Sequence, residues 1–244
     1  MEAKKDKFIG MFNELYEHLK EVNDWDTSFY SLLHQGRNND YIIRKYRDEL
    51  DTVREVRNSI AHNNEYYFLP SNSLYTLLEE ILEKVIDSPK ISDFIDDNLM
   101  VIKEDTSIIK TIQDMKKHDY DQIPVVDQKG KYIELLTTNT IIRWMGDLKL
   151  DQSAKLIIED VQIKEVLNYA EEDEVCEFIS RDSKLDTLID KHESIIKAGN
   201  KIDAFLITEN GSKEEVLQGI ITDWEIPEIY NKLNICVMRQ EIFQ

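Results

Sequence analysis

The sequence has few cysteines and no long apolar segment. Its two cysteines, Cys176 and Cys236, form no CxxC pair and no metal-ligand spacing, so we expect no metal centre and a reducing compartment. The longest apolar runs are a handful of residues, far short of the ~20 that cross a bilayer. The first residues lead into an amphipathic stretch rather than the apolar centre of a signal peptide. We therefore predict a cytoplasmic protein with no membrane partner.

Basic charge is also scarce. The chain has 30 lysines and arginines against 49 acidic residues, a formal net charge of −19, which argues against broad, non-specific binding of nucleic acid. With 41% apolar and 32% charged residues, the composition is that of a globular protein. Any polyanion must find a local basic site, and the densest candidates are Arg37, Arg44, Lys45, Arg47, Arg54 and Arg57.

Residues 1–88 have the apolar periodicity of helices. Apolar side chains recur at three- and four-residue steps near the start, over residues 40–62 and again after Pro70, and this spacing gives a helix one apolar face. A shorter helix is expected around Thr27–Leu33. About 88 residues is small for a domain that folds alone, so we predict an all-α helical bundle that forms a homodimer.

After Ser88-Pro89 short apolar strands alternate with helices, and the order is repeated. In each copy an apolar strand runs into an Asp-Thr or Asp-Ser pair suited to cap the next helix, and two further strands and a helix follow. The second copy carries insertions, one of them the acidic segment Glu171–Glu174. The matching segments are Ile91–Phe94 with Ile158–Val161, Val101–Ile108 with Phe178–Leu185, Gln122–Asp127 with Asp203–Thr208, and Tyr132–Thr137 with Leu217–Thr222.

This duplicated β-α-β-β-α pattern resembles the CBS domain family over roughly residues 89–235. Three marks in register carry the resemblance: the helix start Asp105-Thr106-Ser107-Ile108, the strand Ile123-Pro124-Val125-Val126-Asp127 and the ending Gly219-Ile220-Ile221-Thr222. The resemblance implies two repeats packed face to face, with clefts between them that commonly hold adenosine-containing molecules. We therefore expect an adenine nucleotide (AMP, ADP or ATP) as a regulatory ligand.

The ends of the third strands are the candidate ligand positions. Thr222, followed by Asp223 and Glu225, places a hydroxyl and backbone N–H groups just before a helix, where a phosphate can lie, and a carboxylate that can accept from ribose hydroxyls. Thr137 and Thr140 are their counterparts. The strand residues expected to flank a flat adenine are Ile123, Pro124, Ala204 and Phe205.

Two departures from the family pattern favour the second copy. The family usually has Asp three residues after the Thr, whereas this chain has Thr140 in the first copy and Glu225 in the second. The family also usually has Gly at the position of Glu134 in the first copy, and the second copy keeps this glycine as Gly219. Both threonines are equally suited to act as simple helix caps. Candidate partners for a phosphate are Arg143, Lys184 and Arg181. For Trp224 we expect a position in the core, with the wall of the cleft as the alternative.

The segment Arg57-Asn58-Ser59-Ile60-Ala61-His62 carries a second candidate site. Arg57 occupies an apolar stripe of the 40–62 pattern, where an arginine is costly unless it is paired or binds an anion. Asn58 and His62 are four residues apart and share one helix face. Arg, Asn and His together suit a phosphodiester: His can exchange a proton with a ribose or leaving oxygen, and Arg can stabilise phosphoryl charge.

This segment resembles the HEPN superfamily of helical bundles over roughly residues 5–88. Its mark is an Arg, usually followed by a polar residue, with a His four to six residues later. Many members are metal-independent ribonucleases whose dimers join two motifs, and others are inactive. The resemblance implies catalytic roles for Arg57 and His62, with Asn58 positioning the phosphate. The structural reading remains open: Arg57 can pair with Asp51 or Glu14, and His62 can interact with the helix dipole.

We thus predict an α+β multidomain chain: a HEPN-like helical bundle at residues 1–88, a first CBS repeat at 89–146 and a second, with an inserted linker, at 147–244. The leading hypothesis is a homodimer in which a nucleotide-sensing CBS pair regulates a HEPN-type, metal-independent endoribonuclease that cleaves RNA. The alternative is a non-catalytic adenine-nucleotide sensor whose helical domain mediates dimerisation or partner docking. A third reading is that the Arg57/His62 site binds a nucleotide without cleaving anything.

Overall fold

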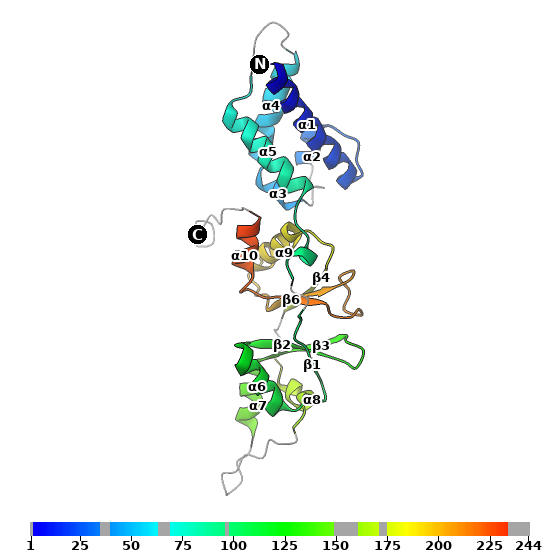
Figure 1. Cartoon of the computed structure of the whole chain (residues 1–244), viewed down its shortest axis with the longest axis vertical. Coiled ribbons are helices and arrows are strands. Elements are labelled where there is room, and N and C mark those ends of the chain that lie inside the picture. Colours follow the sequence, from blue (N-terminus) through cyan, green and yellow to red (C-terminus); the bar gives the residue numbers. More distant parts are fainter. Residues whose placement is uncertain are drawn as a thin grey trace. The chain divides into compact units, whose positions relative to one another are not determined.

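The computed structural model describes residues 2–34, 40–62, 69–95, 98–148, 161–170 and 175–233. The chain divides into two compact units (Figure 1). The first, here called the helical unit, comprises Met1–Pro89, Lys184–Lys191 and Ile229–Gln244, and the second, the β unit, comprises Lys90–Ser183 and His192–Glu228.

The helical unit is all-α in its N-terminal part. Its helices are α1 (Glu2–Asn23), α2 (Phe29–His34), α3 (Tyr41–Lys45), α4 (Arg47–His62) and α5 (Asn72–Ile86). Most side chains of the predicted apolar stripes are buried and form its core, because burial of apolar surface stabilises the fold, whereas Val22 near the end of α1 is 57% exposed. These core residues include Phe8, Leu15 and Leu19 of α1, Leu50, Val53 and Ile60 of α4, and Leu78, Ile81 and Val85 of α5.

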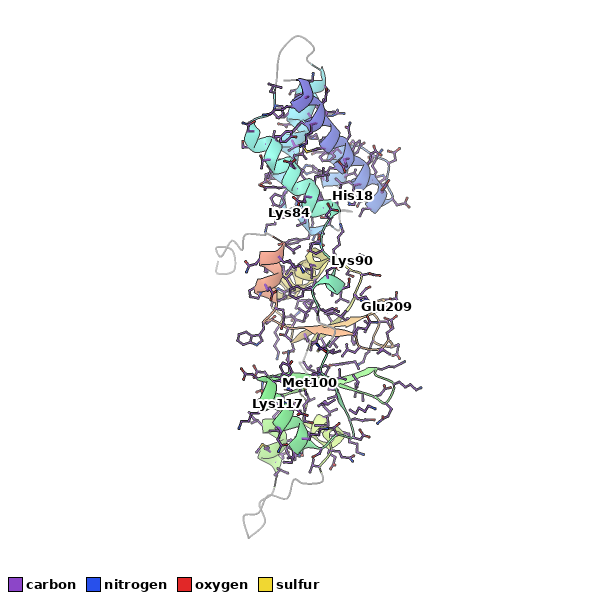
Figure 2. All side chains as sticks on the ribbon, in the orientation of Figure 1. His18, Lys84, Lys90, Met100, Lys117 and Glu209 are labelled. Carbon is purple, nitrogen blue, oxygen red and sulfur yellow. The ribbon has the colours of Figure 1, made fainter. Side chains whose placement is uncertain are left out.

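The apolar pattern over residues 40–62 is divided between two helices. Tyr46 separates α3 from α4 with φ −102° and ψ 24°. The ladder continues through it, because Tyr46 N donates to Ile42 O (3.0 Å) and Leu50 N donates to Tyr46 O (2.9 Å). The break therefore leaves the apolar stripe in register. Lys84 of α5, labelled in Figure 2, donates through Nζ to the Tyr46 hydroxyl at 3.2 Å.

The first sheet of the β unit has the order β1-β2-β3, with β1 (Ile102–Lys103) parallel to β2 (Gln122–Val126) and β2 antiparallel to β3 (Tyr132–Thr137). α6 (Ile108–His118) connects β1 to β2, and α7 (Thr138–Asp147) follows β3. Figure 1 shows α6, α7 and the short α8 (Ile163–Val166) on one side of this sheet.

The second sheet repeats this topology. β4 (Cys176–Ser180) is parallel to β5 (Ala204–Thr208), which is antiparallel to β6 (Gly219–Ile221). α9 (Leu185–Lys197) lies between β4 and β5 in the sequence, and α10 (Ile226–Lys232) follows β6. The duplicated strand-helix-strand-strand-helix order expected from the sequence is thus present in both halves.

The two repeats exchange their leading segments. The 3-10 turn η1 (Ile91–Asp93) precedes the first repeat, yet Ile91 N donates to Ser183 O and Ser92 N to Arg181 O, both at 2.9 Å. The segment before the second repeat behaves likewise, since Ile163 N donates to Thr106 O of the first repeat at 2.9 Å. A second 3-10 turn, η2 (Leu167–Tyr169), follows α8. This exchange ties the two repeats into one structure.

An apolar core joins the two sheets. Its buried members are Val126, Tyr132 and Leu135 from the first repeat and Ala204, Leu206 and Leu217 from the second. Gly130 lies at the turn between β2 and β3 with φ +82°, and its carbonyl accepts from Leu217 N at 3.1 Å. A Cβ at this position would lie 3.3 Å from Val216 Cγ1, so glycine allows both the left-handed turn and the close approach of the two repeats.

Several predicted features lie outside the described residues: Glu171–Glu174, Ile158–Asp160, Arg37 and Cys236. In the part of the chain that is described, no helix has the length and apolar character needed to span a membrane, and no group of three or more potential metal-ligating side chains gathers.

Candidate functional site

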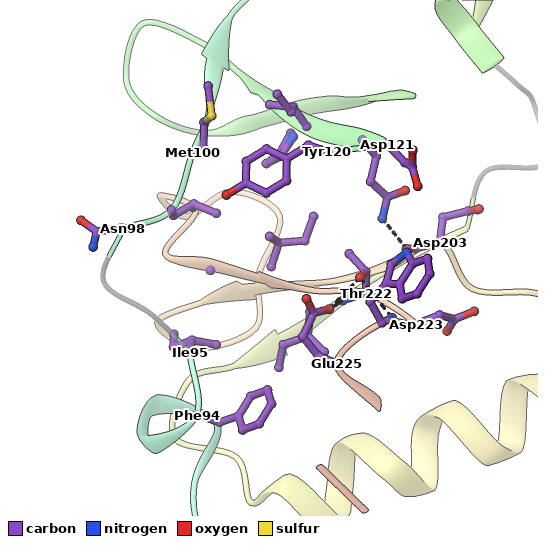
Figure 3. A pocket seen from close by; sticks show the side chains of 18 of the residues that line it. Phe94, Ile95, Asn98, Met100, Tyr120, Asp121, Asp203, Thr222, Asp223 and Glu225 are labelled. Atoms are coloured by element: carbon purple, nitrogen blue, oxygen red, sulfur yellow. Dashed lines mark hydrogen bonds between the residues drawn. The ribbon is translucent and has the colours of Figure 1, made fainter. Parts of the chain in front are cut away.

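A cleft of about 800 Å³ lies between the two repeats within the β unit (Figure 3). Its volume is in the range of small-molecule sites. Figure 3 shows Ile95, Asn98 and Met100 on one side of the cleft, with Asp203 and Asp223 on the other. The residues that line it are Phe94, Ile95, Asn98, Leu99, Met100, Asp119–Pro124, Ile202, Asp203, Gly219–Glu225 and Glu228.

Gly219 sets the shape of one wall. It opens β6, and a Cβ there would lie 3.0 Å from Ile95 Cδ1 and 3.1 Å from Ile207 Cδ1. Any larger residue must therefore push Ile95, itself a lining residue, or distort the strand. The glycine allows the segment that leads into the first repeat to lie directly against the second repeat.

Gln122 and Asp203 connect the two repeats beside the cleft. Gln122 Nε2 donates to the Asp203 carbonyl at 3.0 Å. The Asp203 carboxylate accepts from Val175 N at 2.8 Å, and its other oxygen lies 3.6 Å from Lys201 Nζ. These contacts hold the first residues of β2 and the residue before β5 in fixed relation.

Thr222 and Glu225 form a closed pair after β6. Thr222 N and Thr222 Oγ1 both donate to Glu225 Oε2, at 2.7 and 2.6 Å. Glu225 N donates back to Thr222 O at 3.1 Å. Hydrogen bonds in both directions between these two residues therefore stabilise the turn before α10. Glu225 Oε1 has no hydrogen-bond partner in the described part of the chain and is the oxygen left to accept from a ligand.

The lining is acidic. It contains Asp119, Asp121, Asp203, Asp223, Glu225 and Glu228, and no lysine, arginine or histidine belongs to it among the described residues. Two of these carboxylates have basic neighbours: Asp203 lies near Lys201, and Asp223 Oδ1 lies 3.4 Å from His192 Nε2. The other four make no ion pair with any described residue.

Two aromatic side chains lie exposed in the lining. Tyr120 is 43% exposed and Trp224 is 82% exposed. His118 stacks on the Tyr120 ring with centroids 5.5 Å apart. The structure thus places Trp224 in the lining of the cleft, and the expectation of a core position for this residue is wrong.

Comparison with known families identifies the first repeat of the β unit. Residues 91–147, from η1 through α7, match the model of the CBS domain family. The chain contains a CBS domain. The residues lining the cleft from Phe94 to Pro124 belong to this CBS domain, and those from Ile202 onward belong to the second repeat.

The chain is also similar to several solved structures at low sequence identity. An acetoin utilization protein (AcuB) from Vibrio cholerae is 16% identical, with a TM-score of 0.44, over 60% of this chain and 93% of that chain. The CBS domain pair of protein MJ0100, solved with 5′-methylthioadenosine and S-adenosyl-L-methionine, is 17% identical, with a TM-score of 0.41, over 59% and 98%. CBSX2 in complex with AMP is 13% identical, with a TM-score of 0.42, over 59% and 98%. None of the curated proteins matches the chain.

Five of the nine predicted ligand residues line the cleft: Thr222, Asp223, Glu225, Ile123 and Pro124. Ala204 and Phe205 are not in the lining and are each 1% exposed, because all five residues of β5 are buried. The two residues that precede them, Ile202 and Asp203, line the cleft instead.

Thr137 and Thr140 of the CBS domain act on their own helix. Thr137 Oγ1 accepts from Thr140 N at 3.1 Å and lies 3.0 Å from Thr140 Oγ1, which makes Thr137 the N-cap of α7. Thr140 is fully buried. Neither belongs to the lining of the cleft, which leaves the helix-cap interpretation as the one with observed contacts.

Sequence reasoning missed the lining residues Asn98, Met100, Tyr120 and Asp121. They lie in connecting segments, before β1 and between α6 and β2, which have no apolar periodicity. The acidic pair Asp119 and Asp121 around an aromatic residue was the signal available in the sequence.

The Arg57 segment lies in the last turns of α4. Arg57 Nη1 donates to Asn58 Oδ1 at 3.2 Å, and the guanidinium carbon lies 5.3 Å from the centre of the Phe12 ring. Arg57 Nε is buried and has no hydrogen-bond partner among the described residues. The backbone of His62 ends α4, and its side chain lies outside the described part.

The ion pairs considered for Arg57 are absent from the described residues. Asp51 instead accepts from His34 Nε2 at 2.5 Å and from Arg54 Nε at 3.2 Å, and no hydrogen bond or ion pair joins the described residues Glu14 and Arg57. Arg57 is therefore a half-buried arginine that packs on an aromatic ring, donates to the neighbouring Asn58 and has a buried Nε without a partner among the described residues.

Proposed function

We propose that the cleft of the β unit binds an adenosine-containing ligand, the wider class that includes the adenine nucleotides predicted from the sequence, and that the unit acts as a ligand sensor. The observation that carries this proposal is the cleft between the CBS domain and the second repeat, which combines apolar walls with the unshared oxygen of Glu225. Such a site accommodates a flat base and a polyhydroxyl sugar together.

Each part of the ligand has a partner of matching chemistry. The base contacts the apolar side chains of Ile123, Pro124 and Ile202, and can form hydrogen bonds with backbone groups of the neighbouring strands. The ribose hydroxyls donate to Glu225 Oε1, which the Thr222 contacts hold in place through Oε2. A charged acceptor makes hydrogen bonds about twice as strong as neutral ones, so Glu225 supplies the orientation of the sugar.

Sensing follows if the ligand binds one arrangement of the repeats better than another. Only a difference in affinity between two states can shift their populations. The cleft is built from both repeats, and a ligand that contacts both favours the arrangement in which its contacts are complete. The regulated partner in this proposal is the N-terminal helical segment of the same chain.

For that segment we propose a HEPN-type, metal-independent endoribonuclease. The observation that favours it is Arg57, whose guanidinium is held by Phe12 and Asn58 while Nε stays unpaired. In the proposed reaction His62 accepts the proton of a ribose 2′-hydroxyl, and the 2′-oxygen bonds to phosphorus as the bond from phosphorus to the 5′-oxygen breaks. The products are a 2′,3′-cyclic phosphate and a 5′-hydroxyl, whose oxygen takes its proton from water. Arg57 stabilises the charge on the phosphoryl oxygens. A homodimer would bring two such segments together.

The alternative is a non-catalytic sensor whose helical segment is a dimerisation or docking surface, and a third is a nucleotide site at Arg57/His62 without cleavage. Calorimetric titration of the full chain with adenosine, AMP, ADP and ATP tests the sensor. An RNA-cleavage assay with and without the tightest binder tests the nuclease. Binding with ligand-dependent cleavage supports both proposals, and binding without cleavage under any ligand state rejects the nuclease and leaves the sensor. Absence of binding rejects the sensor.

A further inference from the structure

We infer that the cleft selects its ligand by charge and takes an adenosine derivative whose 5′ substituent is neutral or positively charged, in preference to one that carries free phosphates. This inference rests on the proposed adenosine-binding function and narrows the chemical class of its ligand. Three observations carry it: the acidic lining, the occupied donors of Thr222 and the exposed aromatic rings.

The acidic lining opposes a phosphate. Six carboxylates line the cleft, and the two with basic neighbours, Asp203 and Asp223, leave Asp119, Asp121, Glu225 and Glu228 without an ion pair in the described residues. Like charges in a partly desolvated cleft repel one another more strongly than in bulk water. A doubly charged phosphate group therefore enters against the field of these side chains, whereas a cation enters with it.

Both donors of Thr222, which were expected to hold a phosphate, are already in use. Thr222 N–H and Thr222 Oγ–H both donate to Glu225 Oε2, so a carboxylate already occupies the place predicted for an anion. A phosphate would have to displace it and lie beside it. Thr222 itself thus offers a phosphate no free donor, and Glu225 Oε1 beside it is an acceptor.

The basic residues named as phosphate partners do not belong to the lining. Arg181 Nη1 donates to Gln218 Oε1 at 3.0 Å, and Lys184 Nζ donates to the Val85 carbonyl at 2.7 Å. Arg143 is exposed on α7 and is likewise no lining residue. Among the described residues the cleft therefore offers a phosphate no cationic partner.

The exposed aromatic rings favour a cation. Tyr120 and Trp224 line the cleft with 43% and 82% exposure. The faces of such rings attract a sulfonium or ammonium group, with tryptophan the strongest of the aromatic residues. Rings and carboxylates together are the chemistry that recognises an organic cation on an adenosine scaffold.

A charge series on one scaffold tests this inference. The full chain is titrated calorimetrically with S-adenosylmethionine, S-adenosylhomocysteine, 5′-methylthioadenosine, adenosine and AMP, without divalent cations. We expect the sulfonium compound to bind more tightly than S-adenosylhomocysteine, and AMP to bind at least about tenfold more weakly than adenosine, at low ionic strength. Added salt should weaken the binding of the sulfonium compound and strengthen the binding of AMP, because salt screens electrostatic attraction and repulsion alike.

The outcomes separate this inference from the function on which it rests. Binding of AMP as tight as or tighter than adenosine overturns the charge selection and leaves the adenosine site standing. Failure of all five compounds to bind overturns the adenosine site and the inference with it.

A charge-neutralising variant gives a second readout. Glu228→Gln removes one lining carboxylate from the exposed surface of α10, so folding should be retained. We expect the variant to bind the sulfonium compound about threefold more weakly and AMP about threefold more tightly. A change of this size is what the loss of one charge in a partly exposed cleft produces. Asp147→Asn removes an exposed carboxylate that does not line the cleft and serves as the matched control. Equal shifts in both variants, or shifts of the same sign for both ligands, would contradict the inference.

Discussion

Thr222 and Glu225 are joined twice through a single carboxylate oxygen, with Glu225 Oε2 accepting from Thr222 N at 2.7 Å and from Thr222 Oγ1 at 2.6 Å. The second carboxylate oxygen, Oε1, accepts no hydrogen bond from the described residues. Thr137 of the CBS domain has a different arrangement, in which the hydroxyl caps its own helix through Thr140. The two threonines, equivalent in the duplicated sequence, therefore have different chemistry.

This difference predicts distinct effects for matched substitutions. Thr222→Val removes one of the two bonds that orient Glu225, and we expect adenosine affinity to fall about tenfold. Thr137→Val removes a helix cap, which should lower the free energy of unfolding by about 1 kcal/mol without a change in affinity. Calorimetry and chemical denaturation of both variants make the comparison. Equal loss of affinity in the two variants would show that Thr222 acts only through the fold.

Gly219 predicts a steric test of the cleft. Gly219→Val places new atoms against Ile95 Cδ1, which a Cβ alone would approach to 3.0 Å, so the wall must shift into the cavity or away from β6. We expect adenosine affinity to fall at least about tenfold, with a loss of stability of about 1–3 kcal/mol from overpacking.

A second glycine supplies the control for this test. Gly10 lies in α1, and a Cβ there would have no atom within 4 Å. Gly10→Ala should stabilise the helix by about 0.5–1 kcal/mol and leave ligand affinity at the wild-type value. Wild-type affinity in Gly219→Val would exclude the cleft as the binding site.

Asp186 predicts a pH-dependent gain in stability. Burial, with Asp40 as a further cause, raises the pKa of the Asp186 carboxyl above its ordinary value, although Thr187 and Ser88 donate to it. A raised pKa means that the carboxyl favours the folded state when it is protonated, and this contribution is lost as the pH rises. Asp186→Asn should therefore raise Tm at pH 7, with the gain shrinking as the pH falls toward about 4, the ordinary pKa of aspartate.

Thermal denaturation between pH 3 and pH 8 measures this effect. Asp147→Asn, at an exposed position of α7, is the control and should show little change. A Tm for Asp186→Asn that lies below that of the wild type at pH 7 would mean that the charged form of Asp186 stabilises the fold.

The Arg57 segment predicts loss of RNA cleavage in defined variants. His62→Ala removes the proton-transfer group, and Arg57→Lys keeps a charge but loses the planar fork that stacks on Phe12 and donates to Asn58. Each should reduce the cleavage rate about 100-fold or more, with an unchanged helical circular-dichroism spectrum. Arg47→Lys, on the exposed surface of the same helix, is the matched control. Cleavage at the wild-type rate by His62→Ala would remove His62 from the reaction.

The duplicated order of elements could be predicted from the sequence because strands and helices differ in apolar period, and because the repeated Asp-Thr and Asp-Ser pairs mark equivalent helix starts. The Thr222/Glu225 position followed from the same register. The sequence predicts that Ala204 and Phe205 flank the adenine of the ligand, yet all five residues of β5 are buried. An unbroken apolar run does not show where a strand leaves the core, so the contribution of Ile202 and Asp203 was missed.

The exchange of leading segments could not be predicted. It depends on hydrogen bonds between segments far apart in the chain, such as Ile91 N to Ser183 O, which leave no periodic signal. This exchange brings Phe94 and Ile95 to the second repeat. Ile95 packs closely against Gly219 there, because a Cβ at Gly219 would lie 3.0 Å from Ile95 Cδ1. Asp119 and Asp121 beside Tyr120 were visible in the sequence, but only the fold brings them into the same cleft lining as Glu225.

The most direct test of the adenosine site is a parallel calorimetric titration of adenosine into the wild-type chain, Gly219→Val and Gly10→Ala. The cleft account predicts one adenosine per chain for the wild type and Gly10→Ala, and binding at least about tenfold weaker for Gly219→Val. Equal binding by all three chains, or no binding by the wild type, would contradict it.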